Sequence, residues 1–310
     1  MAQPATPGLI KGCIIAPLVT ILVLVIVVVG GALIVLNMTP ADLGIADLEL
    51  FEGETLETLG LADVKLKEIP AFIKEIMNVD ESKIVTNAPT EQDETAAKGN
   101  IAGSSIVKED GDIDYSSIIT DKVIYLTKQN VEYSDTTLAY IFNQMIVDGA
   151  ESNEDAIEFL KSVNASIGEV TIDKTESVAT LRIVATIDLN SIIGEVKSAL
   201  DEAGVGSFVT LPEKVFLVSY SEMTINEDGQ LVTTSQSLKI NDSDNPVSQA
   251  IMKVLAKTAQ DIAKEEGQQV DTSENVVNAK IGEAFVAIVS NLGKPVEVKD
   301  AAIVVETYTE

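Results

Sequence analysis

The chain has no histidine, no tryptophan and one cysteine among its 310 residues. Without histidine it cannot build a His-dependent catalytic triad, a histidine-ligated zinc site or the usual haem ligation. A single cysteine excludes internal disulfides and cysteine-rich metal clusters. The phosphate-binding GxxxxGK[ST] and dinucleotide-binding GxGxxG patterns are also missing. Ser–Lys pairs remain formally available, but no spacing selects one, so we expect a protein that is not an enzyme.

Positive charge and aromatic side chains are scarce as well. The 49 acidic residues outnumber the 21 basic ones, which gives a formal net charge of −28. Such a chain repels nucleic acid phosphates, so we expect no nucleic acid partner. Aromatic residues make up 4% of the sequence, which argues against a cleft that stacks carbohydrate rings.

A long apolar run near the N-terminus is the strongest signal in the sequence. Residues 13–36 read CIIAPLVTILVLVIVVVGGALIVL and carry no charge. A bilayer core of roughly 30 Å needs about 20 apolar residues in a helix. A secretory signal peptide is the alternative, although its apolar stretch is shorter, about 7–15 residues. We expect an uncleaved transmembrane helix over residues 13–37, after a short cytoplasmic tail of residues 1–12.

The flanking charges predict the orientation of this helix. Lys11 precedes it, and residues 1–37 contain no Asp or Glu. Because positive charge stays in the cytoplasm, we expect a single-pass protein of the cell membrane with its C-terminal domain outside the cell. Cys13 lies at the cytoplasmic edge, either as a small apolar residue or as a site of acylation.

Three regions are expected after the membrane segment. Residues 38–78 form a juxtamembrane segment with two copies of an LG-[IL]-AD unit, LGIADLEL at 43–50 and LGLADVKL at 59–66, followed by a short helix. The copies are two related strand or turn units, or else a paired docking surface. Residues 79–120 are acidic and rich in Gly and Ser, which predicts a linker or mobile loop. Residues 121–310 form the main domain.

The main domain mixes helix and strand patterns. Apolar residues recur at helical spacing over 135–148, 191–203, 246–264 and 274–292, and a further helix is expected at 154–163. Residues 178–189 alternate between apolar and polar, and 166–173 should pair with them. The runs 215–225 and 230–240, joined by Asn226–Gly229, predict a hairpin with a long solvent-facing Ser/Thr face. A last strand is expected over Ala302–Tyr308. The fold class is therefore α+β, with long antiparallel strands packed against amphipathic helices.

The order of these parts resembles a known family. A single N-terminal span, the helix sequence YSDTTLAYIFNQMI and the run LPEKVFLVSYSEMTINEDGQLVTTSQSLKI are similar to YpmS-type membrane-anchored proteins of Gram-positive bacteria. Those proteins are similar to the tubular lipid-binding (TULIP) architecture. The resemblance covers about residues 122–310 and implies a groove for apolar ligands, but it transfers no functional residue.

Two sets of residues are candidate sites. Apolar stripes on two of the expected helices would form ordinary core or line a lipid groove. Those residues are Leu138, Ile141, Phe142, Met145, Val277, Ile281, Phe285 and Ile288. Asp110, Asp112, Asp114 and Asp121 occupy positions 1, 3, 5 and 12 of a loop that echoes an EF-hand calcium site, although Tyr115 stands where the turn requires Gly. The alternative for this loop is an acidic, solvated turn with no cofactor.

These observations predict a membrane-anchored, non-catalytic extracytoplasmic domain that binds a lipid or another apolar ligand, or an envelope protein. A structural or scaffolding subunit of a membrane complex is the alternative, and calcium-dependent adhesion or sensing is a third hypothesis.

Overall fold

The computed structural model describes residues 38–44, 46–47, 49–51, 54–55, 57, 62–120, 124–126, 130–148, 165–175, 178–188, 213–249 and 276–308. The apolar run 13–36, the expected helices at 154–163 and 191–203 and most of the helix expected at 246–264 lie outside these residues. No helix within the described ranges is long and apolar enough to cross a membrane. The transmembrane helix over residues 13–37 therefore stays a prediction.

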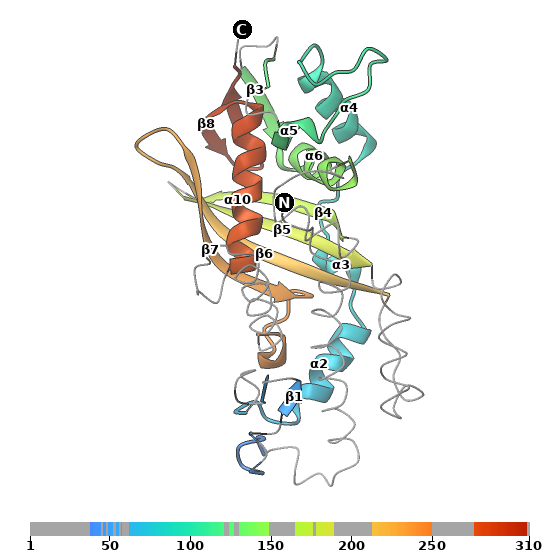
Figure 1. Ribbon diagram of the computed structural model, residues 1–310, viewed down its shortest axis with the longest axis vertical. Helices are drawn as coiled ribbons and strands as arrows, with labels where there is room; N and C mark the ends of the chain where they lie inside the picture. The colour runs from blue at the N-terminus through green and yellow to red at the C-terminus, as the bar shows by residue number, and fades with distance from the viewer. Residues whose placement is uncertain are drawn as a thin grey trace, which may run out of the picture. The chain divides into compact units, whose positions relative to one another are not determined.

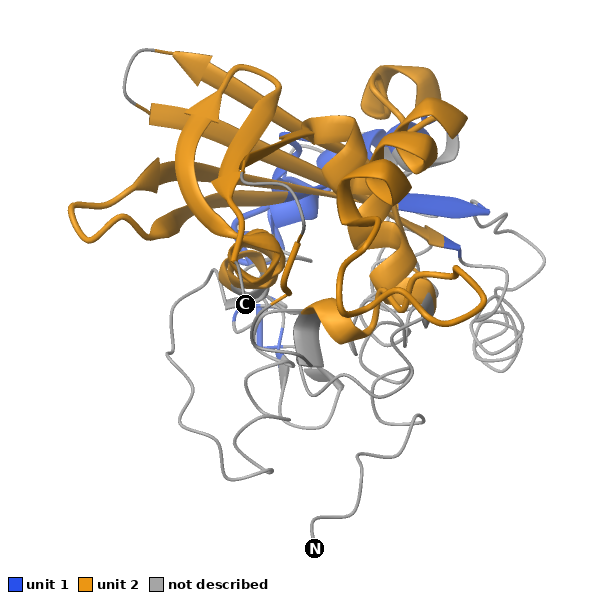
Figure 2. Ribbon diagram, turned by 90° about the horizontal axis from the view of Figure 1, so that it is seen from above, with its two compact units in different colours: residues 1–80, 188–215, 239–276 blue, residues 81–187, 216–238, 277–310 orange. Residues whose placement is uncertain are grey.

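The chain divides into two compact units, coloured in Figure 2. Unit 1 comprises residues 1–80, 188–215 and 239–276, and unit 2 comprises residues 81–187, 216–238 and 277–310. The described strands are β1 Glu49–Phe51, β2 Glu54–Thr55, β3 Asn130–Ser134, β4 Ala165–Thr175, β5 Val178–Asp188, β6 Lys214–Ile225, β7 Leu231–Ile240, β8 Lys294–Lys299 and β9 Ala302–Glu306. The described helices are α2 Glu68–Met77, α3 Glu81–Ile84, α4 Glu91–Ile101, α5 Ser117–Thr120, α6 Asp135–Asp148 and α10 Val276–Leu292.

In unit 1, the described residues of the two LG-[IL]-AD copies lie mostly in turns, and a short strand pair begins at the end of the first copy. The strands β1 and β2 pair antiparallel. The Ala41 amide donates to the Ala62 carbonyl at 3.0 Å, and the Glu57 amide donates to the Ala46 carbonyl at 3.0 Å. Backbone hydrogen bonds thus hold the segments around the two copies together. The short helix expected after them is confirmed as α2, in which Phe72 is fully buried.

Unit 2 is built on a four-stranded sheet with the order β4-β5-β6-β7 (Figure 1). The strands β4 and β5 pair antiparallel, as expected, with an irregularity between Ile167 and Glu169. A tight turn, in which the Asn226 amide donates to the Gln230 carbonyl at 2.9 Å, joins β6 to β7. The alternation in β5 is confirmed, because the residues of its predicted apolar face that lie within the strand are all buried. These residues are Ala179, Leu181, Ile183, Ala185 and Ile187.

The Ser/Thr face that was predicted to face solvent is covered on β6, whereas Thr234 of β7 is exposed. Ser219 and Ser221 of β6 are 2% and 1% exposed. The helix α10 lies against this face, since a Cβ atom added at Gly282 would come within 2.7 Å of the Thr233 hydroxyl. Glycine lets the helix backbone approach the sheet closely enough to bury its hydroxyl groups.

A second sheet of unit 2 has the order β3-β9-β8. The last strand was expected, whereas β3 and β8 were not. Each is short and directly adjoins a long helix, so the helical pattern masks it. Pro295 lies in β8 at the sheet edge, where a missing N–H is tolerated.

Residues 79–120 were predicted to be a linker or mobile loop, but three helices, α3, α4 and α5, form within them, and residues 81–120 belong to unit 2. Thr90 and Asp93 make a reciprocal capping box at the start of α4, which fixes the helix although its sequence is polar. The α4 residues Ala97 and Ile101 are fully buried. The Thr136 hydroxyl of α6 donates to Asp93 at 2.6 Å. Antiparallel sheets with packed helices make unit 2 an α+β fold.

Candidate functional site

The acidic loop predicted as a calcium site forms a compact turn. Val107 and Ile113 make an antiparallel bridge across it. The Asp112 amide donates to the Asp110 carboxylate at 3.1 Å. A hydrogen bond from the Ser116 hydroxyl, 2.6 Å from Asp114, contributes most to lowering the pKa of Asp114.

Asp121, the fourth carboxylate of this calcium prediction, lies outside the described residues. Across the described part of the chain, no three His, Cys, Asp or Glu side chains are grouped so that they could hold a metal ion.

The residues of the predicted apolar groove lie in the interior of unit 2. On α6, Leu138, Ile141, Phe142 and Met145 are at most 1% exposed. On α10, Ile281, Phe285 and Ile288 are at most 3% exposed. Nothing is described of the Val277 side chain. A lipid that used these stripes would therefore have to enter the interior of the unit.

The most deeply buried carboxylate of the described chain is Glu169, which is 0% exposed. It follows Gly168 at the irregularity in β4, where the strand departs from regular pairing. A Cβ atom added at Gly168 would lie 3.1 Å from both the Val85 and Thr186 side chains. The missing side chain at Gly168 thus lets the segment Ile84–Asn87 cross this face of the sheet.

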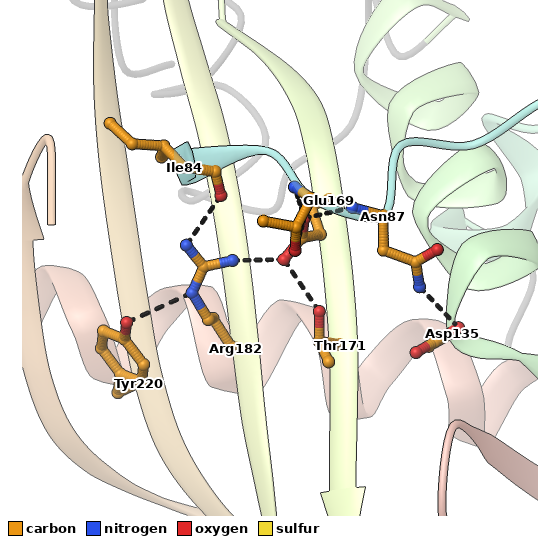
Figure 3. Close-up of polar contacts among 8 residues, drawn as sticks. Ile84, Asn87, Asp135, Glu169, Thr171, Arg182 and Tyr220 are labelled. Atoms are coloured by element: carbon orange, nitrogen blue, oxygen red, sulfur yellow. Dashed lines mark hydrogen bonds and ion pairs between the residues drawn. The ribbon is translucent and has the colours of Figure 1, made fainter. Parts of the chain in front are cut away.

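The segment Ile84–Asn87 supplies donors to Glu169 (Figure 3). The amides of Thr86 and Asn87 both donate to Oε2 of Glu169, the second at 2.7 Å, and the Thr86 hydroxyl lies 3.1 Å from the same atom. The Thr171 hydroxyl donates to Oε1 at 2.9 Å. Both carboxylate oxygens therefore already accept hydrogen bonds from neutral groups.

Arg182 completes this cluster from β5. Its Nη1 atom forms an ion pair with Glu169 Oε1, and its Nη2 atom donates to the Ile84 carbonyl at 2.8 Å. Its Nε atom donates to the Tyr220 hydroxyl at 3.2 Å, and the guanidinium carbon lies 5.8 Å from the Tyr220 ring centroid. A guanidinium presents several donors in a fixed plane, so one side chain can hold a carboxylate, a carbonyl and a phenol together. We call Ile84, Thr86, Asn87, Glu169, Thr171, Arg182 and Tyr220 the Glu169 cluster.

Asn87 connects this cluster to a second buried carboxylate. Its side-chain amide lies 3.4 Å from Oδ1 of Asp135, which is 4% exposed at the start of α6. Burial raises the pKa of Asp135, and the nearby Glu169 charge adds to that effect against opposing hydrogen bonds from Thr136, Ile172 and Asn87.

The pKa of Glu169 shifts in the opposite direction to that of Asp135. Burial opposes its ionisation, yet hydrogen bonds from Asn87, Thr171 and Thr86, together with the Arg182 charge, outweigh burial and lower its pKa. Two carboxylates with opposite shifts can mark an acid–base pair. Donors from Thr86, Asn87, Thr171 and Arg182 occupy both oxygens of Glu169, so the cluster forms an ionic clamp that holds the segment Ile84–Asn87 on the sheet.

A second polar cluster lies on the opposite face of the sheet, under α10. Asn278 is 1% exposed. Its Oδ1 atom accepts from the Ser219 hydroxyl. Its amide nitrogen donates to the Tyr220 carbonyl at 3.0 Å and to the Ser235 hydroxyl at 2.7 Å. This neutral cluster fixes the position of α10 along β6 and β7.

The alternation predicted over residues 178–189 puts Arg182 on the polar face of its strand, but the sequence pattern did not reveal either cluster. One signal was available, because Arg182 is the only arginine in a chain with 20 lysines. The partners of Arg182 are as far as 98 positions away in sequence, so no local pattern identifies them.

The comparisons with known proteins give no relative. No family model matches the chain, and no curated protein or solved structure is significantly similar to it.

Proposed function

We propose that the chain is a membrane-anchored, non-catalytic protein whose acidic domain, from residue 38 onward, lies outside the cell and binds a lipid or another apolar ligand, or an envelope protein. The observation that carries the proposal is the uncharged run of residues 13–36 ahead of a domain that holds all 49 acidic residues. The saturated Glu169 cluster supports a non-catalytic role, because its hydrogen-bonding groups serve the fold.

Three features support an apolar ligand. The stripes on α6 and α10 place large apolar side chains in one unit, and the resemblance to YpmS-type and TULIP proteins implies a groove of this chemistry. The hydroxyl groups of Ser219 and Ser221 make the contact between α10 and β6 less apolar than an ordinary core. Burying less apolar surface there gains less hydrophobic free energy, so α10 is held less strongly against the sheet.

The ligand is tested in the full chain reconstituted into nanodiscs that contain a lipid with a photoreactive acyl chain. After irradiation, mass spectrometry locates the modified residues. We expect adducts on peptides from α6 or α10 as well as on residues 13–36. A Phe285→Ala variant should lose the α10 adducts, whereas Val147→Ala, a change at a 64% exposed position, should keep them. Adducts confined to residues 13–36 would exclude the lipid form of the proposal.

The orientation is tested separately. A Thr234→Cys variant in a Cys13→Ser background carries one thiol, on an exposed residue of β7. A membrane-impermeant maleimide should label this thiol in intact cells. Labelling only after lysis would show that the domain faces the cytoplasm.

A scaffolding role is the second candidate, and the hydrogen bonds around the two LG-[IL]-AD copies favour it. They join Ala41 to Ala62 and Ala46 to Glu57, which brings parts of the two copies together as a paired docking surface requires. Deleting residues 43–66 should then abolish recovery of crosslinked partners from cells, while unchanged recovery would exclude this role. A calcium-dependent function predicts a higher melting temperature in millimolar calcium, because ligand binding stabilises the folded state.

A further inference from the structure

The two ends of α10 are held by different kinds of contact. Near its C-terminal end, the Asn291 side-chain amide donates to the Ile118 carbonyl at 2.5 Å, and the Ile124 amide donates to the Asn291 carbonyl at 3.2 Å. The Tyr308 hydroxyl donates to the Ser290 carbonyl at 3.1 Å. Three segments of unit 2 outside the helix therefore hold this end.

Close packing adds to these hydrogen bonds at the C-terminal end. Val289 and Leu292 are at most 1% exposed. Directly after the helix, a Cβ atom added at Gly293 would lie 2.8 Å from the Glu306 carbonyl oxygen and 2.8 Å from the Val305 side chain. Because the backbone passes so close to β9 here, this end of α10 has little room to move.

The N-terminal half of α10, residues 276–284, rests on hydroxyl groups instead. Asn278 accepts a hydrogen bond from Ser219, and the backbone of Gly282 lies against Thr233. A Cβ atom added at Gly282 would also lie 3.5 Å from the Ser221 hydroxyl oxygen. That hydroxyl is buried and has no hydrogen-bond partner among the described residues.

Separating the two halves of α10 from the sheet has unequal consequences. Hydrogen bonds between amide and hydroxyl groups are exchanged for hydrogen bonds to water, so their loss is largely compensated. The Ser221 hydroxyl would gain a partner, because water could then reach it. Separating the C-terminal half would instead expose apolar side chains to water, which is unfavourable. The N-terminal half is therefore the part of α10 that leaves the sheet most readily.

We propose that α10 is a gate for the apolar ligand, whose N-terminal half swings away from β6 and β7 while residues 290–293 act as the hinge. Opening uncovers Ile281, which is 3% exposed when α10 lies on the sheet. Phe285 and Ile288 continue the same helix face toward the hinge, so the ligand reaches the interior of unit 2 along this stripe. This gate rests on the apolar-ligand function proposed above and adds where unit 2 admits the ligand.

Thiol labelling of the folded protein tests the opening without any ligand. The full chain in detergent micelles, in a Cys13→Ser background, carries either Ser221→Cys or the matched control Val289→Cys, and both positions are 1% exposed. A maleimide should label Ser221→Cys about tenfold faster or more, because local opening exposes it while the hinge end stays closed. Equal rates, or faster labelling of Val289→Cys, would overturn the gate.

A reversible crosslink tests the gate with the ligand. A Cβ atom added at Gly282 would lie 3.4 Å from the Thr233 Cβ atom, close to the spacing of about 3.5–4.5 Å in disulfides. Gly282→Cys with Thr233→Cys, in the Cys13→Ser background, should therefore form a disulfide that holds α10 on the sheet. In nanodiscs with the photoreactive lipid, oxidation should lower the adducts on α6 and α10 about tenfold, because it removes the binding-competent state, and reductant should restore them.

The oxidised and reduced forms separate failure of the gate from failure of the function. The Cys13→Ser parent, treated with the same oxidant, should keep its adducts. Equal adducts in the oxidised and reduced double variant would overturn the gate and leave the apolar-ligand function standing. Adducts confined to residues 13–36 in the parent and in both forms would overturn the lipid function and the gate with it, even if Ser221→Cys is labelled faster.

Discussion

Each face of the four-stranded sheet carries a covering segment, and the two segments are held by different chemistry. On one face, the ion pair between Glu169 and Arg182 holds the segment Ile84–Asn87. On the other, the neutral amide of Asn278 holds α10 against serine hydroxyls. Removing the partner of a buried charge lowers the free energy of unfolding far more than removing the partner of a buried hydroxyl. We call these the ionic face and the neutral face, and we expect substitutions on the ionic face to change the free energy of unfolding more than those on the neutral face.

The largest effect is expected on the ionic face. Arg182→Met leaves the Glu169 carboxylate buried without its counter-charge. Breaking a buried pair in this way destabilises a protein by about 3–5 kcal/mol, measured by urea unfolding. The matched control combines Arg182→Met with Glu169→Gln, which removes the stranded charge and should recover part of the loss. If Arg182→Met alone lowers the free energy of unfolding by less than about 1 kcal/mol, solvent reaches Glu169.

The next effect concerns the contact between α10 and β7. Gly282→Ala places a methyl group 2.7 Å from the Thr233 hydroxyl oxygen. Overpacking of this kind costs about 1–3 kcal/mol. Adding Thr233→Ala removes that oxygen and should restore stability, with a further gain because alanine favours a helix interior over glycine. If Gly282→Ala alone is stabilising, α10 does not lie as close to β7 as described.

The ionic face should also give the protein a distinctive acid response. The pKa of Glu169 is lowered in the folded state, so ionised Glu169 stabilises the fold above its unfolded pKa of about 4.3. That stabilisation is lost as the pH falls through the lower, folded-state pKa. The raised pKa of Asp135 acts in the opposite direction, since protonation at falling pH relieves its burial. Urea unfolding between pH 7 and pH 3 should thus show a shallower loss of stability in Glu169→Gln than in the unsubstituted chain, and parallel curves would contradict the assignment.

The smallest effect distinguishes two neighbouring hydroxyls on the neutral face. The Ser221 hydroxyl is buried and has no hydrogen-bond partner within the described residues, so Ser221→Ala should change stability by less than about 0.5 kcal/mol or increase it slightly. Ser219→Ala removes the donor to Asn278 and should cost about 1 kcal/mol. Thermal unfolding of the two variants side by side measures the difference, and equal losses would show that Ser221 has a partner.

Local patterns predicted most of the regular elements of unit 2. The alternation in β5, the turn residues Asn226–Gly229 and the helical spacing in α6 and α10 each depend on neighbours a few positions away. The same reasoning predicted a linker over residues 79–120, because the stabilising contacts of α4 come from its capping box and from α6 rather than from an apolar stripe. The strands β3 and β8 escaped prediction for a related reason, since pairing with β9 defines them.

The sequence by itself determined the α+β class, the hairpins, the net charge and the absence of histidine chemistry, because these follow from composition and short-range periodicity. Only the tertiary structure decided which segments cover the two faces of the sheet and that Glu169 and Arg182 form an ion pair. Alternation shows which residues share a face, but it does not show what covers that face. The partners Ile84, Thr86 and Asn87 reach Glu169 across more than 80 positions of sequence, a separation that only the folded chain closes.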